Sequence, residues 1–201
     1  MNKLSTALLL TVPFTQVEGR LSGNKCPAVD TYALRTVDVD RLEGNWYQVQ
    51  KDMMFPWTMT CECSTQEYKK QDNGDSRFVY RCYSWMMAFQ YVDAKGSMIN
   101  CLNNDTATSC QSTMDGVGSI GDSNYLAIED DWFATYICND DLLGFTHTDY
   151  VIINHRQKNV TRQQILDIQA QLKVKLPNYD FSDTNMYTEK QEDTCVYTWS
   201  L

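Results

Sequence analysis

Between residues 46 and 156 the sequence is divided into short segments rich in Val, Ile, Tyr, Phe, Trp and Thr, separated by clusters of Asn, Asp, Gly and Ser. The segment residues favour strands and the separating residues favour turns. This repeated pattern constrains the fold more than any other feature, and it indicates an all-β protein. It predicts eight strands, at residues 45–51, 62–69, 77–85, 88–93, 97–102, 123–128, 132–138 and 149–154.

Two connections between these strands have a clear character. The segment 71–75 contains Asn73-Gly74, which supplies the left-handed backbone angles of a tight hairpin and joins the second strand to the third. Residues 103–122 are polar and rich in glycine, which predicts a long flexible loop. Cys101 and Cys110 are placed to hold the base of that loop.

One helix is expected after the strands. Thr161 followed by Gln164 forms a capping-box pattern, and Pro177 ends the helical segment. Apolar residues then recur along one helical face, at Ile165, Ile168, Leu172 and Leu176. A helix lying on a membrane surface is the alternative, but the polar face is rich in glutamine with few basic residues. Packing against the outside of a sheet is favoured.

Eight sequential strands with tight turns and one late helix predict an eight-stranded up-and-down antiparallel barrel with a C-terminal α-helix packed on the outside. Closing the sheet removes the exposed edges that an open sheet must protect. A barrel of this size leaves room for one small ligand.

The N-terminus resembles a secretory leader. An apolar run from Leu4 to Val12 follows Lys3, and a small residue, Gly19, suits signal peptidase, so residues 1–19 are predicted to be a signal peptide. A first core helix is the alternative, but Pro13 disfavours it. Residues 20–201 are then expected to form a single domain, and no apolar run approaches the ~20 residues that span a bilayer.

Eight cysteines and two sequons agree with export. The cysteines lack the short spacings and companion histidines of a zinc site, and neither His147 nor His155 has a partner at ligand spacing, so disulfides and no metal are predicted. Cys61 could bridge to Cys82 and Cys101 to Cys110, although spacing alone leaves the connectivity open. Asn104 and Asn159 are candidate glycosylation sites. A net charge of −9 disfavours nucleic acid as a partner.

Three residues introduce a resemblance to a known family. Gly44-Asn45-Trp46 opens the first strand in the manner of lipocalins, and Arg156 follows the last strand. In that family the tryptophan closes the barrel floor against such an arginine, whose guanidinium can stack on the indole. The cysteine order resembles the apolipoprotein D and bilin-binding branch. That resemblance implies disulfides Cys26–Cys138 and Cys63–Cys195.

A second resemblance is more specific. The segment from Asn124 to Trp132, ending in Asp130-Asp131-Trp132, looks like the lipocalin domain of violaxanthin de-epoxidases, and the similarity covers residues 40–196. It implies Asp130 as a catalytic acid, with ascorbate as the external reductant. However, the tyrosine that the family needs before the terminal arginine is replaced by Asn154-His155, and the enzyme's flanking cysteine-rich and glutamate-rich domains have no counterpart here. An Asp130 that only begins a strand is the simpler interpretation.

Aromatic and methionine side chains could line a ligand cavity, since flat polarizable surfaces suit conjugated molecules. The same side chains could also fill an ordinary core. The segment 53–57 and the junction at Trp85 are expected near the barrel mouth, where they would gate the ligand, contact a partner or touch a membrane surface, or merely pack as loops. The candidate ligand-binding residues are Trp46, Tyr47, Met53, Met54, Phe55, Trp57, Trp85, Tyr125, Trp132 and Tyr136.

These observations lead to a primary hypothesis and two alternatives. The first hypothesis is a lipocalin that carries a small hydrophobic ligand, such as a carotenoid, another isoprenoid or a tetrapyrrole, with no tightly bound cofactor. The second is a de-epoxidase-like oxidoreductase, and the third is a secreted inhibitor or scavenger that acts through its loops. The leader favours secretion, whereas the de-epoxidase resemblance implies the thylakoid lumen. The sequence does not predict an oligomeric state.

Overall fold

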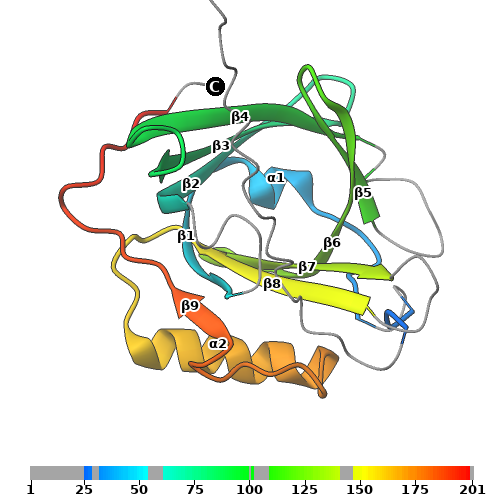
Figure 1. The fold of residues 1–201 in the computed structure, drawn as a ribbon. Coiled ribbons are helices and arrows are strands. Elements are labelled where there is room, and N and C mark those ends of the chain that lie inside the picture. Colours follow the sequence, from blue (N-terminus) through cyan, green and yellow to red (C-terminus); the bar gives the residue numbers. More distant parts are fainter. Residues whose placement is uncertain are drawn as a thin grey trace, which may run out of the picture.

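The computed structural model of the protein describes residues 25–28, 32–53, 61–99, 101, 109–140 and 147–199. Eight antiparallel strands close into a barrel, a short helix lies at one end of it, and a longer helix packs outside (Figure 1). The elements are α1 (Val39–Leu42), β1 (Gly44–Asp52), β2 (Cys61–Lys70), β3 (Ser76–Ser84), β4 (Gln90–Ile99), β5 (Ser109–Met114), β6 (Gly118–Ile128), β7 (Trp132–Asp140), β8 (His147–His155), α2 (Arg162–Lys175) and β9 (Met186–Thr188).

The order of pairing confirms the predicted up-and-down barrel. Each strand from β2 to β8 pairs with the next one in the chain, and β1 closes the sheet by pairing with both β8 and β2. The short strand β9, which the sequence pattern did not predict, pairs with the last three residues of β1. The first half of β1 therefore has β2 on one side, and the second half has β9 there instead.

The middle of the barrel differs from the prediction. The expected strands at 88–93 and 97–102 are one strand, β4, and the expected loop at 103–122 contains β5 and the beginning of β6. Glycine caused both errors, because it was taken to interrupt strands. A Cβ on Gly96 would lie 2.1 Å from the Thr113 carbonyl oxygen, so this glycine permits close approach of β4 and β5. Gly116 and Gly118 have positive φ angles at the turn between β5 and β6.

The helix α1 was too short to produce a periodic signal. Asp38 caps it, since the side chain accepts from the backbone N–H groups of Asp40 and Arg41. Val39 and Leu42 are buried and pack into the same cluster as Trp46. This single turn therefore covers one end of the barrel.

The helix α2 follows the prediction. Thr161 caps it, its side chain accepts from the Gln164 backbone, and the reciprocal bond of the capping box is also present. The predicted apolar face, Ile165, Ile168, Leu172 and Leu176, is buried against the outer surface of the barrel. Among the described residues, no helix has the length and apolar character to cross a membrane.

The strand register shows which side chains face the interior. Trp46 is paired with Gln66, Gln66 with Tyr80, and Tyr80 with Ala94, and directly paired residues project from the same face of a sheet. Trp46 packs against Phe133 from the other side of the barrel, so this face is the interior. The strand directions place the first residue of β1 and α1 at one end. The turns between β3 and β4 and between β5 and β6 lie at the opposite, open end.

Candidate ligand-binding site

The floor of the barrel is closed by a stacked pair. The guanidinium carbon of Arg156 lies 3.4 Å from the centroid of the Trp46 ring. Its nitrogens donate to the carbonyls of Asn45 at 3.2 Å, Arg41 at 2.9 Å and Glu43 at 2.7 Å. The indole Nε1 of Trp46 donates to the Leu42 carbonyl at 2.7 Å. Arg156 thus satisfies the free carbonyls around α1 while it covers the outer side of the indole.

Gly44 allows this arrangement. Its φ is +103°, a conformation that side chains disfavour, and a Cβ there would lie 2.8 Å from Nη1 of Arg156. Glycine is therefore required at this position of the Gly-x-Trp pattern for two reasons. The backbone has a positive φ, and Arg156 occupies the space that a Cβ would need.

Aromatic side chains fill the space above the floor. Trp46 and Phe133 meet edge to face at 4.8 Å, and Phe133 in turn contacts Tyr68 and Tyr125, each at 5.9 Å. The Tyr125 hydroxyl lies 2.8 Å from the Met98 sulfur. Burial raises the pKa of Tyr68 and Tyr125 above the usual range of a tyrosine, so both hydroxyls stay protonated. This layer is packed solid.

Toward the open end the interior wall changes character. The strand register shows that the inward-facing residues here are Thr135, Ile137 and Tyr150 on one side of the barrel. On the other side they are Tyr80 and Ala94. All five residues are only partly buried, in contrast to the fully buried floor. The upper interior wall therefore keeps exposed surface at these positions, although Ile152, which pairs with Thr135 on the same face, is buried. Its lining mixes aliphatic, aromatic and hydroxyl side chains.

Polar atoms without a partner lie between these two zones. Gln48 and Asn154 are paired across β1 and β8, and Asn154 is also paired with Phe133, so both face inward. Within the described residues, Oε1 of Gln48 and both polar side-chain atoms of Asn154 are buried without a hydrogen-bond partner. Unsatisfied buried polar atoms cost about 1–3 kcal/mol each, so they call for an explanation.

A buried ion pair lies where β1 parts from β2. The Lys51 ammonium lies 2.8 Å from the Glu189 carboxylate, both side chains are fully buried, and Lys51 also donates to the Cys61 carbonyl at 2.8 Å. Glu189 accepts further bonds from the Ser64 backbone and the Gln48 amide. Burial raises the pKa of Glu189, while the charge of Lys51 opposes that rise.

Gln191 completes this junction. Its side-chain amide donates to the carbonyls of Gln48 at 2.9 Å and Ser64 at 3.0 Å. Gln191, which follows β9 in the chain, therefore joins β1 to β2 at a height where these strands have no direct ladder. We call Lys51, Glu189 and Gln191 the seam residues.

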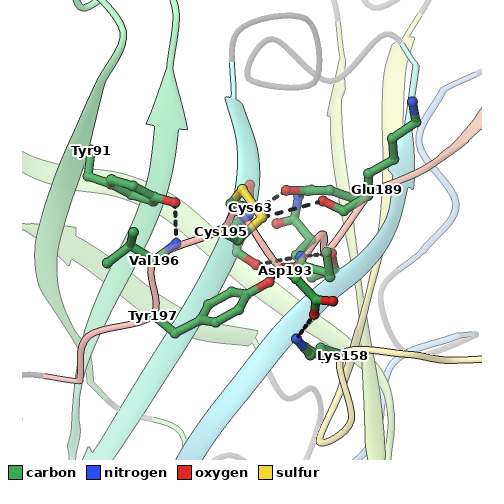
Figure 2. Close-up of a disulfide and its surroundings, with 12 residues drawn as sticks. Cys63, Tyr91, Lys158, Glu189, Asp193, Cys195, Val196 and Tyr197 are labelled. Carbon is green, nitrogen blue, oxygen red and sulfur yellow. Dashed lines mark hydrogen bonds and ion pairs between the residues drawn. A yellow bond between two sulfur atoms is a disulfide. The ribbon is translucent and has the colours of Figure 1, made fainter.

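Four disulfides stabilise the barrel. They join Cys26 to Cys138 and Cys63 to Cys195, the pairs that the family resemblance implies. The other two join Cys61 to Cys82 and Cys101 to Cys110, the candidate pairs whose connectivity the spacing left open. Figure 2 shows Cys63–Cys195 beside the seam, with Glu189 on one side and Tyr91 on the other. Asp193 forms an ion pair with Lys158 in the same region. The C-terminal segment is thus attached to β2 by a covalent bond.

Three predicted ligand-binding residues face away from the interior. Trp132 and Tyr136 lie on the outer side of β7, in the cluster beneath α2. Tyr47 also projects outward, where its ring meets those of Tyr197 and Trp199 at 5.1 and 5.8 Å. Aromatic residues on these strands therefore anchor the helix and the C-terminal segment instead of lining the cavity.

The other candidates have mixed positions. Trp46 belongs to the floor and Tyr125 to the aromatic layer above it, whereas Met53 and Trp85 are exposed at the open end. Asn159 is exposed just before α2. The predicted leader at residues 1–19 and the candidates Met54, Phe55, Trp57 and Asn104 lie outside the described residues. The sequence pattern did not identify Gln48, Lys51, Asn154 and Glu189, because an inward-facing polar residue has the same spacing as an outward-facing one.

Asp130 does not have the apolar surroundings expected of a neutral acid. Its side chain is 91% exposed in the turn between β6 and β7, and its carboxylate lies 3.6 Å from Arg41. Asp131 beside it lies 3.7 Å from Nε2 of His155, and Nδ1 of His155 accepts from the Gln157 backbone. These carboxylates lie outside the closed end of the barrel, away from the accessible interior.

Comparison with known proteins supports the fold assignment. No protein-family model matches the sequence, and no curated protein sequence matches it. Solved structures do match. Lobster apocrustacyanin A1 is 19% identical with a TM-score of 0.67, and the alignment covers 87% of this chain and 93% of that one. Insecticyanin from the tobacco hornworm Manduca sexta is 15% identical with a TM-score of 0.70, over 88% and 92%.

A third match is the amine-binding protein of Rhodnius prolixus in its tryptamine complex, which is 13% identical with a TM-score of 0.55, over 82% of this chain and 86% of that one. Together with the closed eight-stranded barrel and its outer helix, these matches show that the chain has the lipocalin fold.

The floor geometry predicts an unequal effect of two glycine substitutions. Gly44→Ala and Gly116→Ala both force alanine into a positive φ, which costs about 1–3 kcal/mol. A Cβ at Gly116 meets nothing within 4 Å, whereas one at Gly44 meets Arg156. We therefore expect Gly44→Ala to lower the free energy of unfolding by at least ~1 kcal/mol more than Gly116→Ala, measured by denaturant unfolding of the oxidised protein. Equal losses would show that Arg156 adjusts without cost.

The environment of His155 predicts a pH dependence of stability. Burial lowers the pKa of His155, and the charge of Asp131 offsets only part of that effect. The unfolded chain therefore takes up the proton first, near pH 6.5. Between that pH and the lower folded pKa, the free energy of unfolding should fall with decreasing pH, by at most ~1.4 kcal/mol per pH unit. His155→Gln should flatten the curve in this window, and a curve parallel to that of the wild type would refute the assignment.

Proposed function

We propose that the protein is a carrier that binds one small, largely apolar molecule inside the barrel. The supporting observation is the division of the interior into a closed aromatic floor and an accessible upper wall that carries Tyr80, Ala94, Ile137 and Tyr150. An interior filled by its own side chains would bury these wall residues as fully as those of the floor. A partly exposed apolar lining above a closed floor is the arrangement typical of a ligand site.

The proposed ligand is a flat conjugated molecule with a polar end, either a carotenoid or other isoprenoid, or a tetrapyrrole. The tyrosine rings of the wall offer flat polarizable faces. The unpaired side-chain oxygens of Gln48 and Asn154 would accept hydrogen bonds from a hydroxyl or lactam N–H of the ligand. The unpaired Asn154 amide would donate to a ligand carbonyl, once the ligand displaces the side chains that now cover these atoms. A pure hydrocarbon would leave those atoms unsatisfied. The Rhodnius neighbour is solved with tryptamine, so a small aromatic amine belongs in the comparison.

The proposed site of action is extracellular. Four disulfides indicate folding in an oxidising compartment, as secreted proteins do. The predicted leader and the sequon at Asn159 agree with this route. The thylakoid lumen is the alternative that the de-epoxidase resemblance implies.

A substitution that fills the cavity tests the carrier proposal. Ala94 faces inward and is partly buried, whereas its neighbour Lys95 is exposed on the outside of the same strand. We expect Ala94→Trp to reduce the affinity for β-carotene-derived pigments and biliverdin by at least ~10-fold, because the indole occupies the guest's space, and Lys95→Trp to leave it unchanged. Absorbance titration of the purified protein measures both. Equal binding by the two variants would place the ligand outside the barrel.

The enzymatic alternative depends on Asp130. A general acid for epoxide opening must hold its proton at the pH of the reaction, and an apolar surrounding favours the protonated carboxyl. The exposed carboxyl beside Arg41 lacks such a surrounding, and Asn154-His155 stands before Arg156, where the enzyme that the sequence resembles has its second required tyrosine. We therefore propose that the chain binds pigment without converting it.

Violaxanthin with ascorbate at mildly acidic pH provides the test. We expect the wild-type protein and Asp130→Asn to give the same pigment spectrum over time, with a binding shift and no de-epoxidation. Conversion by the wild type that disappears in Asp130→Asn would establish the oxidoreductase instead.

A further inference from the structure

The turn between β3 and β4 carries an unusual set of exposed apolar side chains. Trp85, Met86, Met87 and Phe89 are 51%, 64%, 60% and 68% exposed. The segment from Ser84 to Gln90 contains no charged residue. Contiguous exposed apolar groups of this kind mark an interaction site more often than isolated ones do. We call residues 85–89 the hairpin tip.

The hairpin tip is held in place by its strands. The ladder between β3 and β4 continues without interruption from Ser76–Met98 to Ser84–Gln90, directly below the tip. Ala88 and Phe89 turn the chain with φ angles of +58° and +59°. The strand directions place the tip at the open end of the barrel, where Met53 and Val117 are also exposed. The apolar groups are therefore presented on a framework that needs little ordering when it binds.

The size of the hairpin tip limits what can cover it. Four side chains of roughly 200 Å² each, about three-fifths exposed, present on the order of 500 Å². A stable interface with a second copy of the chain needs about 800 Å² from each partner. A lipid surface has no such requirement, because a few aromatic and apolar side chains at the headgroup boundary suffice for reversible binding.

A groove on the outer wall lies next to the hairpin tip. It has a volume of about 370 Å³ and is lined by Tyr83 and Tyr91 at the base of the tip, and by Glu62, Lys190 and Glu192. The Cys63–Cys195 disulfide and Val196 form the remaining wall, and the Val196 backbone donates to the Tyr91 hydroxyl at 2.6 Å (Figure 2). Tyr83 and Tyr91 lie 5.3 Å apart.

The groove combines both signs of charge with aromatic rings. Carboxylates and tyrosine faces attract an alkylammonium group, and an ammonium side chain attracts a phosphate. A zwitterionic phosphocholine headgroup has both parts. Anionic lipids would instead meet the net charge of −9 of the whole chain.

We propose that the hairpin tip inserts into a phosphatidylcholine surface, with the adjacent groove taking one headgroup. Tyr83 and Tyr91 line the groove and lie on the two strands that carry the tip, so a single orientation serves both. This orientation directs the open end of the barrel to the lipid surface. The inference does not require a ligand in the barrel, and its test is independent of pigment binding.

Co-sedimentation with phosphatidylcholine vesicles tests the hairpin tip. We expect wild-type protein to bind and Trp85→Ser/Phe89→Asn to bind at least ~10-fold more weakly, since both changes remove exposed apolar area and asparagine tolerates the positive φ at position 89. Val174→Ser is the matched control, because Val174 is 82% exposed on α2 and should not contribute. Absence of vesicle binding by the wild type, or equal loss in the control, would overturn the proposal.

A second pair of variants tests the groove. Glu62→Gln/Glu192→Gln should weaken binding to phosphatidylcholine several-fold, whereas Asp72→Asn/Asp122→Asn makes the same change in net charge outside the groove and should not. Soluble phosphocholine should compete with the vesicles. Equal effects of the two pairs would overturn the headgroup site. Tighter binding to phosphatidylglycerol, or a dimer in sedimentation velocity that the hairpin-tip variant abolishes, would overturn the choice of partner.

Discussion

The barrel depends on closing one seam, between the first strand and the second. A sheet that curls into a barrel must pair its last free edges, or two rows of backbone groups remain unsatisfied. Here the direct ladder joins only Gly44 through Tyr47 to β2. Beyond that point β1 pairs with β9, and the seam residues Lys51, Glu189 and Gln191 bridge the gap with side-chain hydrogen bonds and a buried ion pair. Burying two charges is costly, and here the Cys61 carbonyl on Lys51 and the Ser64 and Gln48 donors on Glu189 offset part of the cost.

Closure at the seam and at the floor gives the barrel two different ends. At one end Arg156, Trp46 and α1 leave no accessible interior. At the other end the wall residues remain partly exposed, and the apolar hairpin tip projects beside them. Among the described residues, the route into the barrel lies at this open end, and it passes the groups best suited to a lipid surface. The proposed ligand site and the proposed membrane contact are consequently adjacent in space.

Much of this arrangement could be predicted from the sequence, because it depends on local patterns. The strand segments, the capping box at Thr161 and the tryptophan and arginine of the floor each have a distinctive signature. What failed was the assignment of faces. Trp132 and Tyr136 alternate correctly, but alternation does not reveal which face lies inside, and bulges in β1 and β6 shift the alternation by one residue. Tertiary packing decides which side of the sheet α2 covers, and the local sequence pattern does not encode it.

The seam was equally beyond prediction. Nothing near Lys51 in the sequence indicates Glu189 as its partner, since 138 residues separate them and an isolated lysine in a strand usually faces solvent. The glycines of β4 and β6 caused a different error, because they led to the prediction of loops where the structure has strands. They resemble loop residues in composition, although Gly96 permits the close approach of two strands.

The position of the seam residues along the chain sets an order of assembly. Glu189, Gln191 and Cys195 follow all eight barrel strands, so a chain that emerges from the ribosome N-terminus first has every wall strand available before the groups that seal it. Until then Lys51 lacks its partner Glu189, and the part of β2 beyond its ladder with β1 lacks the groups that bridge it to β1. The late stage of biosynthesis is therefore the period in which the nascent protein is most exposed to pairing with the wrong strand, and in which a chaperone or disulfide isomerase has most to protect.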